Sequence, residues 1–474
     1  MIYEHKVLRF LYDRSPVVLQ DLMVSGYGLY RRLEQQGPQQ GGFRQGLARL
    51  ERLNPDQVVE AQEAAMRDLI SHAYDSVPFY HRRLDELGLK PKDFQRLNDL
   101  FRLPVLTKND VRDHFPELTA TNTDPRSVTI GRTGGTTGVP LKFYLDHTQV
   151  AMDHAITMRQ WEWAGYRPGD RVVFLRGFTL VAPGHESRVF WRRDWFNNWF
   201  YLSGFHLSPA TQPLYVRKLH EWQPKYIAAY PSLLFEVARR LAQTEDYIPL
   251  RGVFTSSELL TPAERALIEE RFKCRVFDRY GTGERLVVAH QCEHGTYHLN
   301  PGFGILQVQR SDGQPAAPGE VGDFILSGLS NRSMPLIRYA IGDRGALRSE
   351  SGCPCGRNLP ALEVVEGRKD DSLITAEGRV MPRAGLDQVY EFSPNIEQCQ
   401  LYQRVPGQVV VRVVRRPGYT DEDSHRLLSE LRKRVGEGTE ITIEFRDSIP
   451  LAASGKYRFI VSEVGSSPGA IEPS

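Results

Sequence analysis

The chain has 474 residues, of which 41% are hydrophobic and 25% charged, and its formal net charge is +2. This balance excludes a disordered chain, and the length predicts two or more domains. A near-neutral charge without an extended Lys/Arg run disfavours nucleic acid or an anionic membrane surface as a partner. No run of about eighteen apolar residues predicts a membrane span, and the N-terminus lacks a clean signal-peptide core, so a soluble, cytoplasmic protein is expected.

The first clear predicted element is a helix that starts at Asn54-Pro55, a cap residue followed by proline at the first helical position. Apolar residues recur at helical spacing until Pro78 stops the pattern. Further along, β-rich runs alternate with helical ones, which predicts a layered α/β domain with largely parallel strand pairing. The predicted strands are 171–177, 226–231, 252–257 and 274–281, and the predicted helices are 231–243 and 262–272.

The later part of the chain predicts two further units. β-rich segments at 297–308, 322–329 and 336–345 predict a β-subdomain after the α/β core. Near residue 368 the character changes to a β-α-β pattern of a small α+β domain, with its elements at 408–416, 421–435 and 440–449. We therefore predict an N-terminal domain over 1–367, a C-terminal domain over 368–464 and a disordered tail over 465–474.

The strongest motif is Thr-Gly-Gly-Thr-Thr-Gly-Val-Pro at 133–140, between two β-like runs. Glycines let the backbone approach a ligand closely, and threonine hydroxyls and amide N–H groups donate to phosphate oxygens. The spacing is not that of a Walker P-loop. The alternative is a hairpin turn, although a turn rarely needs three threonines.

A second motif, Tyr280-Gly281-Thr282-Gly283-Glu284, directly follows a predicted strand. Open α/β sheets bind ligands at the carboxyl ends of their strands. Tyr280 offers a ring for base stacking, and Glu284 offers an oxygen ligand for Mg²⁺. A polar loop with one exposed glutamate is the alternative.

Three charged residues complete the candidate site. Asp343 can accept both hydroxyls of a ribose, and Arg368 can donate to ribose or phosphate. Lys456, beside Gly455, can stabilise negative charge on an α-phosphate and an attacking carboxylate. In isolation, a surface ion pair explains Asp343 or Arg368 at least as well, and a single loop lysine such as Lys456 is usually just solvated.

In this order and at this spacing, the motifs resemble those of the adenylate-forming superfamily of acyl-CoA synthetases, peptide-synthetase adenylation domains and luciferases. The similarity is greatest to the phenylacetate–CoA ligase-like branch, with its capsule-biosynthesis relatives, and it extends from LISHAYDSVPFYHRRLDELG to SGKYRFIVS. The resemblance implies a large N-terminal domain that binds ATP and a carboxylic acid, and a small mobile C-terminal lid. It also leaves homodimerisation open.

The resemblance also assigns roles to residues. The phosphate loop comprises Thr133, Gly134, Gly135, Thr136, Thr137 and Gly138. The adenine-side loop comprises Ser256, Ser257 and Glu258, and the nucleotide site also takes Tyr280, Gly281, Thr282, Asp343 and Arg368. Glu284 is implied as the magnesium ligand, Asp370 as the hinge and Lys456 as the adenylation lysine.

The activity that the resemblance implies is attack of a carboxylate on the α-phosphorus of ATP, release of pyrophosphate, and transfer of the acyl group to CoA. An aryl or arylacetic acid is the default substrate. Three departures from the family pattern are Val139 in the phosphate loop, Gly283 before the magnesium glutamate, and the segment after Asp370. They leave two alternatives: an adenylating enzyme with a non-CoA acceptor (an amine, a carrier-protein thiol or a molecule that receives AMP), and a nucleotide-binding protein that has lost catalysis.

The cysteines predict a metal site. Cys353 and Cys355 form a Cys-x-Cys pair in a Gly/Pro turn, and Cys292 and His298 form a Cys-x₅-His pair, which together suit structural zinc. Relatives on the same branch carry similar segments, and His294 competes as the fourth ligand. Cys274 and Cys399 stand apart and are interpreted as buried structural thiols.

Overall fold

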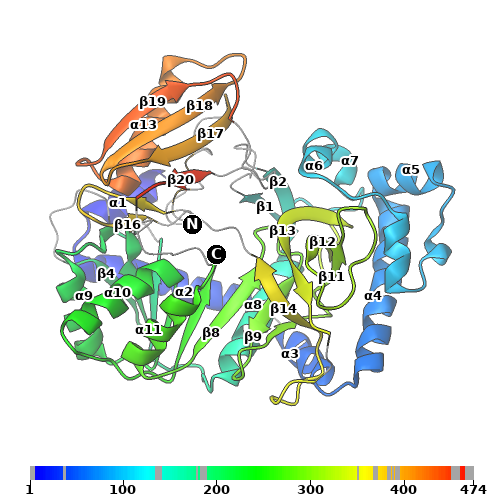
Figure 1. Cartoon of the computed structure of the whole chain (residues 1–474), viewed down its shortest axis with the longest axis horizontal. Helices are drawn as coiled ribbons and strands as arrows, with labels where there is room; N and C mark the ends of the chain where they lie inside the picture. The colour runs from blue at the N-terminus through cyan, green and yellow to red at the C-terminus, as the bar shows by residue number, and fades with distance from the viewer. Residues whose placement is uncertain are drawn as a thin grey trace, which may run out of the picture.

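The computed structural model describes residues 6–35, 39–133, 141–177, 180–181, 189–349, 352–366, 372–381, 386, 389, 395–449 and 459–464. It confirms the α/β class: a helical N-terminal part, a large central sheet and a C-terminal domain with a sheet of its own (Figure 1). Within these ranges, no helix combines the length and apolar character that crossing a bilayer requires.

Helices make up the first part of the chain. Helix α4 (Pro55–Ser76) begins at a capping box, in which the Asn54 side chain accepts from Gln57 N at 2.9 Å and the Gln57 side chain accepts from Asn54 N at 3.1 Å. It ends before Pro78, as predicted. The other helices here are α1 (Lys6–Arg14), α2 (Val17–Gln35), α3 (Gln39–Leu50), α5 (Pro78–Glu86), α6 (Lys108–Asp113) and α7 (Phe115–Leu118), with 3₁₀ turns η1 (Pro91–Asp93) and η2 (Leu97–Arg102).

A twelve-stranded mixed sheet forms the centre, in the order β11-β12-β13-β14-β10-β9-β8-β7-β6-β3-β5-β4. Strands β5, β3, β6, β7 and β8 pair in parallel, which confirms the predicted core. The predicted β-subdomain continues this same sheet, because β8 pairs antiparallel with β9. The bounds are β3 (Val172–Arg176), β4 (Trp191–Asp194), β5 (Trp199–Ser203), β6 (Tyr226–Ala229), β7 (Gly252–Ser256), β8 (Val276–Gly281), β9 (Val288–Gln291), β10 (Tyr297–Leu299), β11 (Gly304–Gln309), β12 (Gly322–Gly328), β13 (Tyr339–Leu347) and β14 (Ala361–Glu366).

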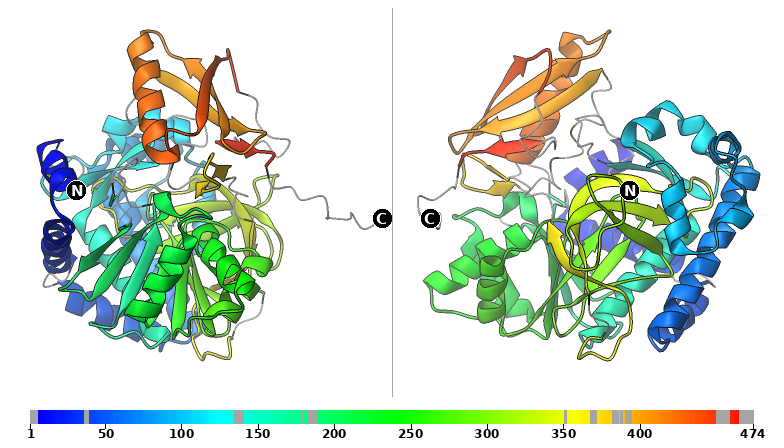
Figure 2. Two further views of the ribbon diagram at one scale, coloured as in Figure 1. Left: turned by 90° about the vertical axis from the view of Figure 1, so that its left-hand side faces the viewer. Right: turned by 45° about the vertical axis from the view of Figure 1, so that its right-hand side comes forward.

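Helices cover both faces of the parallel strands (Figure 2). On one face, α9 (Gln212–Trp222), α10 (Pro231–Gln243) and α11 (Pro262–Phe272) pack against Val173 and Leu175. On the other face, α8 (His147–Trp163) packs against Phe174 and Phe254, and the Trp161 ring stacks on Phe254 at 4.5 Å. Strand β3 is therefore buried on both sides, which explains its uninterrupted apolar sequence.

Helix α2 lies along the outer edge of the sheet, where β4 has no further strand beside it. Asp21 Oδ1 accepts from Arg193 N at 3.0 Å, and Ser25 Oγ accepts from Trp195 N at 3.0 Å. A side chain at Gly28 would collide with Asp194, because an added Cβ would lie 2.0 Å from its Oδ2. The helix thus satisfies backbone groups that an edge strand otherwise exposes.

The C-terminal domain contains a four-stranded sheet in the order β19-β18-β17-β20. The predicted β-α-β pattern is confirmed, since β18 and β19 pair in parallel across helix α13. The elements are the hairpin β15 (Leu373–Ile374) and β16 (Val380–Met381), β17 (Ile396–Gln403), β18 (Gln408–Arg415), α13 (Asp421–Val435), β19 (Glu440–Phe445) and β20 (Ile460–Ser462). The domain boundary at 368 and the tail 465–474 fall outside the described residues and stay predictions.

This domain lies over the end of the sheet where the parallel strands finish (Figure 1). Phe205, in the turn η3 (Gly204–His206) after β5, belongs to the apolar core of the C-terminal domain. Arg379 donates to Phe205 O and, at 2.6 Å, to Val435 O at the end of α13. The contact brings the C-terminal domain close to the strand ends, where α/β sheets bind their ligands.

Candidate functional site

The loops after β7 and β8 lie next to each other, because these strands pair in parallel with Ser256 beside Arg279. Ser257 adopts a left-handed backbone conformation, with φ of 75°. Glu258 Oε2 accepts from Ser232 N at 3.0 Å, at the first turn of α10. This glutamate, predicted on the adenine side, therefore also satisfies a free amide at a helix N-terminus.

The structure brings Tyr280 and Asp343 together from positions 63 residues apart. Tyr280 lies near the carboxyl end of β8, and its hydroxyl donates to Asp343 Oδ2 of β13 at 3.1 Å. The Tyr280 ring meets the edge of Phe324 at 5.8 Å. Both side chains are half-buried, so a ligand can reach the ring and the carboxylate.

Glu284 is buried, with 3% of its surface exposed, and its Oε1 accepts from Tyr339 OH at 3.0 Å. Tyr339 lies on β13, four residues before Asp343. The same strand therefore supplies the partner of Glu284 and the partner of Tyr280. Gln149 Nε2 donates to Arg285 O at 2.8 Å and so ties this loop to α8. Arg285 N donates to Thr282 O at 3.1 Å within the same turn. The sequence analysis did not single out Tyr339, although it lies four residues before the predicted Asp343.

Thr133 ends strand β1 (Val128–Thr133), which pairs antiparallel with β2 (Leu141–Asp146), as the β-like flanks of the motif predicted. The other predicted members of the phosphate loop, at 134–138, lie outside the described residues. So do Arg368, Asp370 and Lys456. Their roles remain predictions from the sequence.

Cys292, His298, Cys353 and Cys355 converge, and one ligand atom from each lies within 4.8 Å of all the others. The Cys292 and Cys353 sulfurs are 3.7 Å apart, and Cys355 Sγ is 3.3 Å from His298 Nε2. Two thiolates about 2.3 Å from a tetrahedral zinc lie about 3.75 Å apart, so this spacing suits that ion. His294 contributes its backbone N–H, which donates to Cys292 Sγ at 3.3 Å.

The surroundings of this cluster suit metal ligation. His298 Nδ1 lies 3.4 Å from Leu359 O, which leaves Nε2 to face the sulfurs. Burial lowers the pKa of His298, and the neutral imidazole is the form that binds metal. Burial raises the pKa of Cys292 to about 11, so a cation is needed to hold its thiolate. Burial also raises the pKa of the isolated Cys274 to about 12, in keeping with an inert structural thiol.

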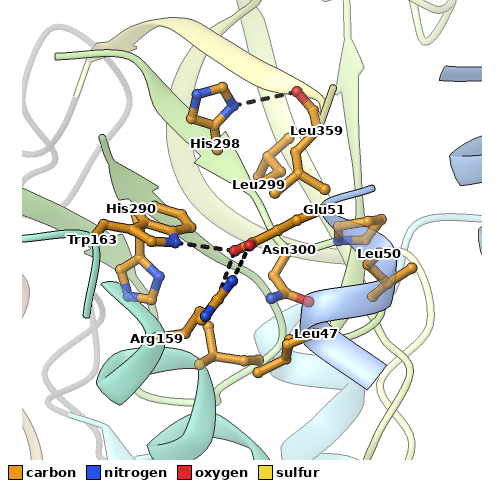
Figure 3. A pocket seen from close by; sticks show the side chains of 12 residues that line it. Leu47, Leu50, Glu51, Arg159, Trp163, His290, His298, Leu299, Asn300 and Leu359 are labelled. Carbon is orange, nitrogen blue, oxygen red and sulfur yellow. Dashed lines mark hydrogen bonds and ion pairs between the residues drawn. The ribbon is translucent and has the colours of Figure 1, made fainter. Parts of the chain in front are cut away.

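A small cavity lies beside the cluster, between α3, α8 and β10 (Figure 3). Glu51 pairs with Arg159 and accepts from Trp163 Nε1 at 3.0 Å, while His290 Nε2 and Asn300 Oδ1 are buried without a partner among the described residues. Its open space is ≈ 10 Å³, enough for about one water molecule. The cavity is too small for a nucleotide or an acid, so it is a packing feature and not the active site.

Comparisons with known proteins identify relatives that cover most of the chain. The family model described as CapK C-terminal domain matches residues 373–463. Protein CapK of Staphylococcus aureus is 24% identical over 463 residues, covering 97% of this chain and 100% of that protein. Phenylacetate-coenzyme A ligases of Escherichia coli and Thermus thermophilus are each 28% identical, covering 85% and 82% of this chain and 94% and 84% of their own lengths.

Solved structures show the same fold. A 2-hydroxyisobutyryl-CoA ligase in complex with 2-HIB-AMP and CoA in the thioesterification state has a TM-score of 0.58 and 20% identity, and the match covers 88% of this chain and 91% of the ligase. The same ligase in the postadenylation state has a TM-score of 0.55 and 19% identity, with 88% and 92% covered. The chain is therefore similar along most of its length to phenylacetate-coenzyme A ligases and to CapK, and it shares the fold of an acyl-CoA ligase.

Proposed function

We propose that the protein uses ATP to activate a carboxylic acid as an acyl-adenylate, and then transfers the acyl group to CoA. The observation that carries this proposal is the pairing of Tyr280 with Asp343 and of Glu284 with Tyr339 at the carboxyl ends of the parallel strands. An aromatic ring, a ribose-accepting carboxylate and a buried carboxylate then lie at one place, which suits a magnesium nucleotide. The motifs at 133–140 and around Lys456 supply the remaining positive and hydrogen-bonding groups.

In this mechanism the acid's carboxylate attacks the α-phosphorus of ATP and pyrophosphate leaves in line. Tyr280 positions the adenine and Asp343 accepts hydrogen bonds from the ribose. Lys456 stabilises negative charge as the new bond forms, so the protein works by orientation and electrostatics. Glu284 fits Mg²⁺, which would neutralise charge on the triphosphate, because the hydrogen bond from Tyr339 uses one carboxylate oxygen and, among the described residues, leaves the other for a hard cation.

The hydrogen bond between Tyr280 and Asp343 can be tested directly. Tyr280→Phe keeps the ring but removes the hydroxyl that donates to Asp343, so the ribose carboxylate loses an orienting contact. We expect the KM for ATP to rise about 5- to 10-fold, which corresponds to the loss of one hydrogen bond, with kcat changed less. Steady-state kinetics measure this, with Tyr247→Phe at an exposed site as the control. An unchanged KM would show that this hydroxyl has no part in ATP binding.

We also propose that Cys292, His298, Cys353 and Cys355 hold a structural zinc ion, since a set of four protein ligands leaves no open position. The ion would join the turn before β10 to the turn before β14, two strands that pair antiparallel. Elemental analysis should find close to one zinc per chain. Cys355→Ser should lose the metal and lower the Tm by about 5–10 °C. Cys274→Ser, outside the cluster, should keep the bound zinc and the wild-type Tm. A wild-type protein purified without zinc, whose Tm does not change when zinc is added, would contradict the site.

The overall activity is tested by ATP–pyrophosphate exchange across a panel of aryl, arylacetic and aliphatic acids, each with and without CoA. Acid-dependent exchange would demonstrate adenylation, and CoA-dependent release of AMP would identify the ligase. A non-CoA acceptor is the second candidate, because the segment after Asp370 departs from the family pattern that admits CoA. In that case exchange would occur, but AMP release would require an amine, a carrier-protein thiol or another acceptor. Absence of exchange with every acid, despite ATP binding, would favour a protein without catalysis.

A further inference from the structure

A row of polar side chains crosses the carboxyl ends of the parallel strands. Arg176 on β3 lies beside Ser203 on β5, and Ser256 on β7 lies beside Arg279 on β8. On the strand between them, Ala228 of β6 lies beside both Phe174 of β3 and Phe254 of β7. Two residues further along all three strands, the same register places Tyr230 between Arg176 and Ser256. Because side chains alternate along a strand, this row faces α8, as Phe174 does.

The arginines in this row differ in their partners. Arg279 pairs with Asp153 of α8 and donates to Thr157 Oγ1 at 3.0 Å, and Arg285 pairs with the same Asp153 at 3.1 Å. No described carboxylate lies within ion-pair distance of Arg176, and its Nε is buried without a hydrogen-bond partner in the described part of the chain. Burial lowers the pKa of Arg176, and the nearby Arg279 lowers it further. Among the described residues Arg176 therefore has no paired anion, and a ligand that supplies one would offset the cost of burying its guanidinium.

The side chains near Arg176 indicate which chemical groups the rest of that ligand would carry. Below the row, Tyr201 stacks on Phe174 with ring centres 5.1 Å apart, which forms an aromatic surface. Tyr201 and Tyr230 are both close enough to interact electrostatically with Arg176.

We propose that the acid substrate carries a second anionic group at its far end, and that Arg176 binds it. This inference rests on the proposed function, because the reacting carboxylate must lie at the nucleotide loops after β7 and β8. Arg176 lies two strands from Ser256, about 10 Å at the usual strand spacing. That separation suits an acid with an aromatic or short aliphatic body between two charged ends. Arg176 is then the residue that selects such acids over plain arylacetates.

The test compares phenylacetate with 4-carboxyphenylacetate and its neutral analogue 4-carbamoylphenylacetate in ATP–pyrophosphate exchange. The wild-type enzyme should prefer the diacid by roughly 10- to 100-fold in kcat/KM, the gain from a charge-assisted pair. Arg176→Leu should lose this preference while keeping its activity on phenylacetate. Arg176→Lys should keep part of the preference, because the charge remains. Arg171→Leu, at an exposed position just before the start of β3, should behave as wild type.

Two kinetic results would overturn the inference while leaving adenylation intact. One is a wild-type enzyme that does not distinguish the three acids. The other is an Arg176→Leu variant, folded by its Tm, that loses activity equally on all of them. If no acid supports exchange at all, the proposed function fails, and calorimetry then decides about Arg176. Binding of 4-carboxyphenylacetate by wild type and Arg176→Lys but not by Arg176→Leu would support the anion site, and equal or absent binding would reject it.

Discussion

Lys456→Ala is expected to abolish acyl-adenylate formation, with a fall in kcat of about 10²- to 10³-fold or more in the first half-reaction. The family resemblance places this ammonium group at the α-phosphate and the attacking carboxylate. Without it, the charge that develops in the transition state is left to water and the backbone. ATP–pyrophosphate exchange measures this half-reaction alone.

The second half-reaction separates a catalytic role from a structural one. Supplied acyl-adenylate already contains the bond whose formation we propose Lys456 to assist, so its conversion to the thioester by CoA should be largely intact in Lys456→Ala. Lys433→Ala removes an exposed lysine of α13 that pairs with Glu430, and it should leave both half-reactions unchanged. Equal loss of both half-reactions in Lys456→Ala would rule out the specific role.

Glu284→Gln should lower kcat/KM for MgATP by about 10²-fold and raise the Mg²⁺ concentration needed for half-maximal rate. The substitution keeps the size of the side chain and an oxygen that can accept from Tyr339 OH, so the fold should be retained. What it removes is the negative charge, which is the part that binds a hard divalent cation.

A magnesium titration at fixed ATP distinguishes this effect from a general loss of activity. Glu221→Gln, on the exposed surface of α9, serves as the matched control and should follow the wild-type curve. A Glu284→Gln enzyme with wild-type kinetics would remove this residue from the metal site.

The sequence predicted the elements that are encoded locally. Helices α10 and α11 match their predicted bounds, and α4 begins at the Asn54 capping box, because caps, proline and apolar spacing are all short-range signals. The parallel strands β3, β6, β7 and β8 were predicted for the same reason, whereas β5 was not predicted. By contrast, the antiparallel continuation of the sheet through β9 depends on pairing between distant segments, which short-range patterns do not specify.

The candidate site divides in the same way. The cysteine and histidine set could be proposed from spacing and from the resemblance, and β10 and β14 bring the two turns together, with His298 opposite Ala361. Arg176 was visible only as the end of an apolar strand. Its importance depends on strand register and on the absence of a described acidic partner, and neither can be derived from RVVFLRG alone.

The covering of strand β4 by helix α2 determines what happens when the N-terminal helices are removed. The Asp21 and Ser25 side chains occupy amides that would otherwise be free to template another strand. A shortened chain that starts after α2 would present the rim of a twelve-stranded sheet to its neighbours, together with the exposed rings of Trp195 and Phe196. Such a chain should polymerise through strand addition. Helix α2 therefore protects the sheet edge from forming fibres.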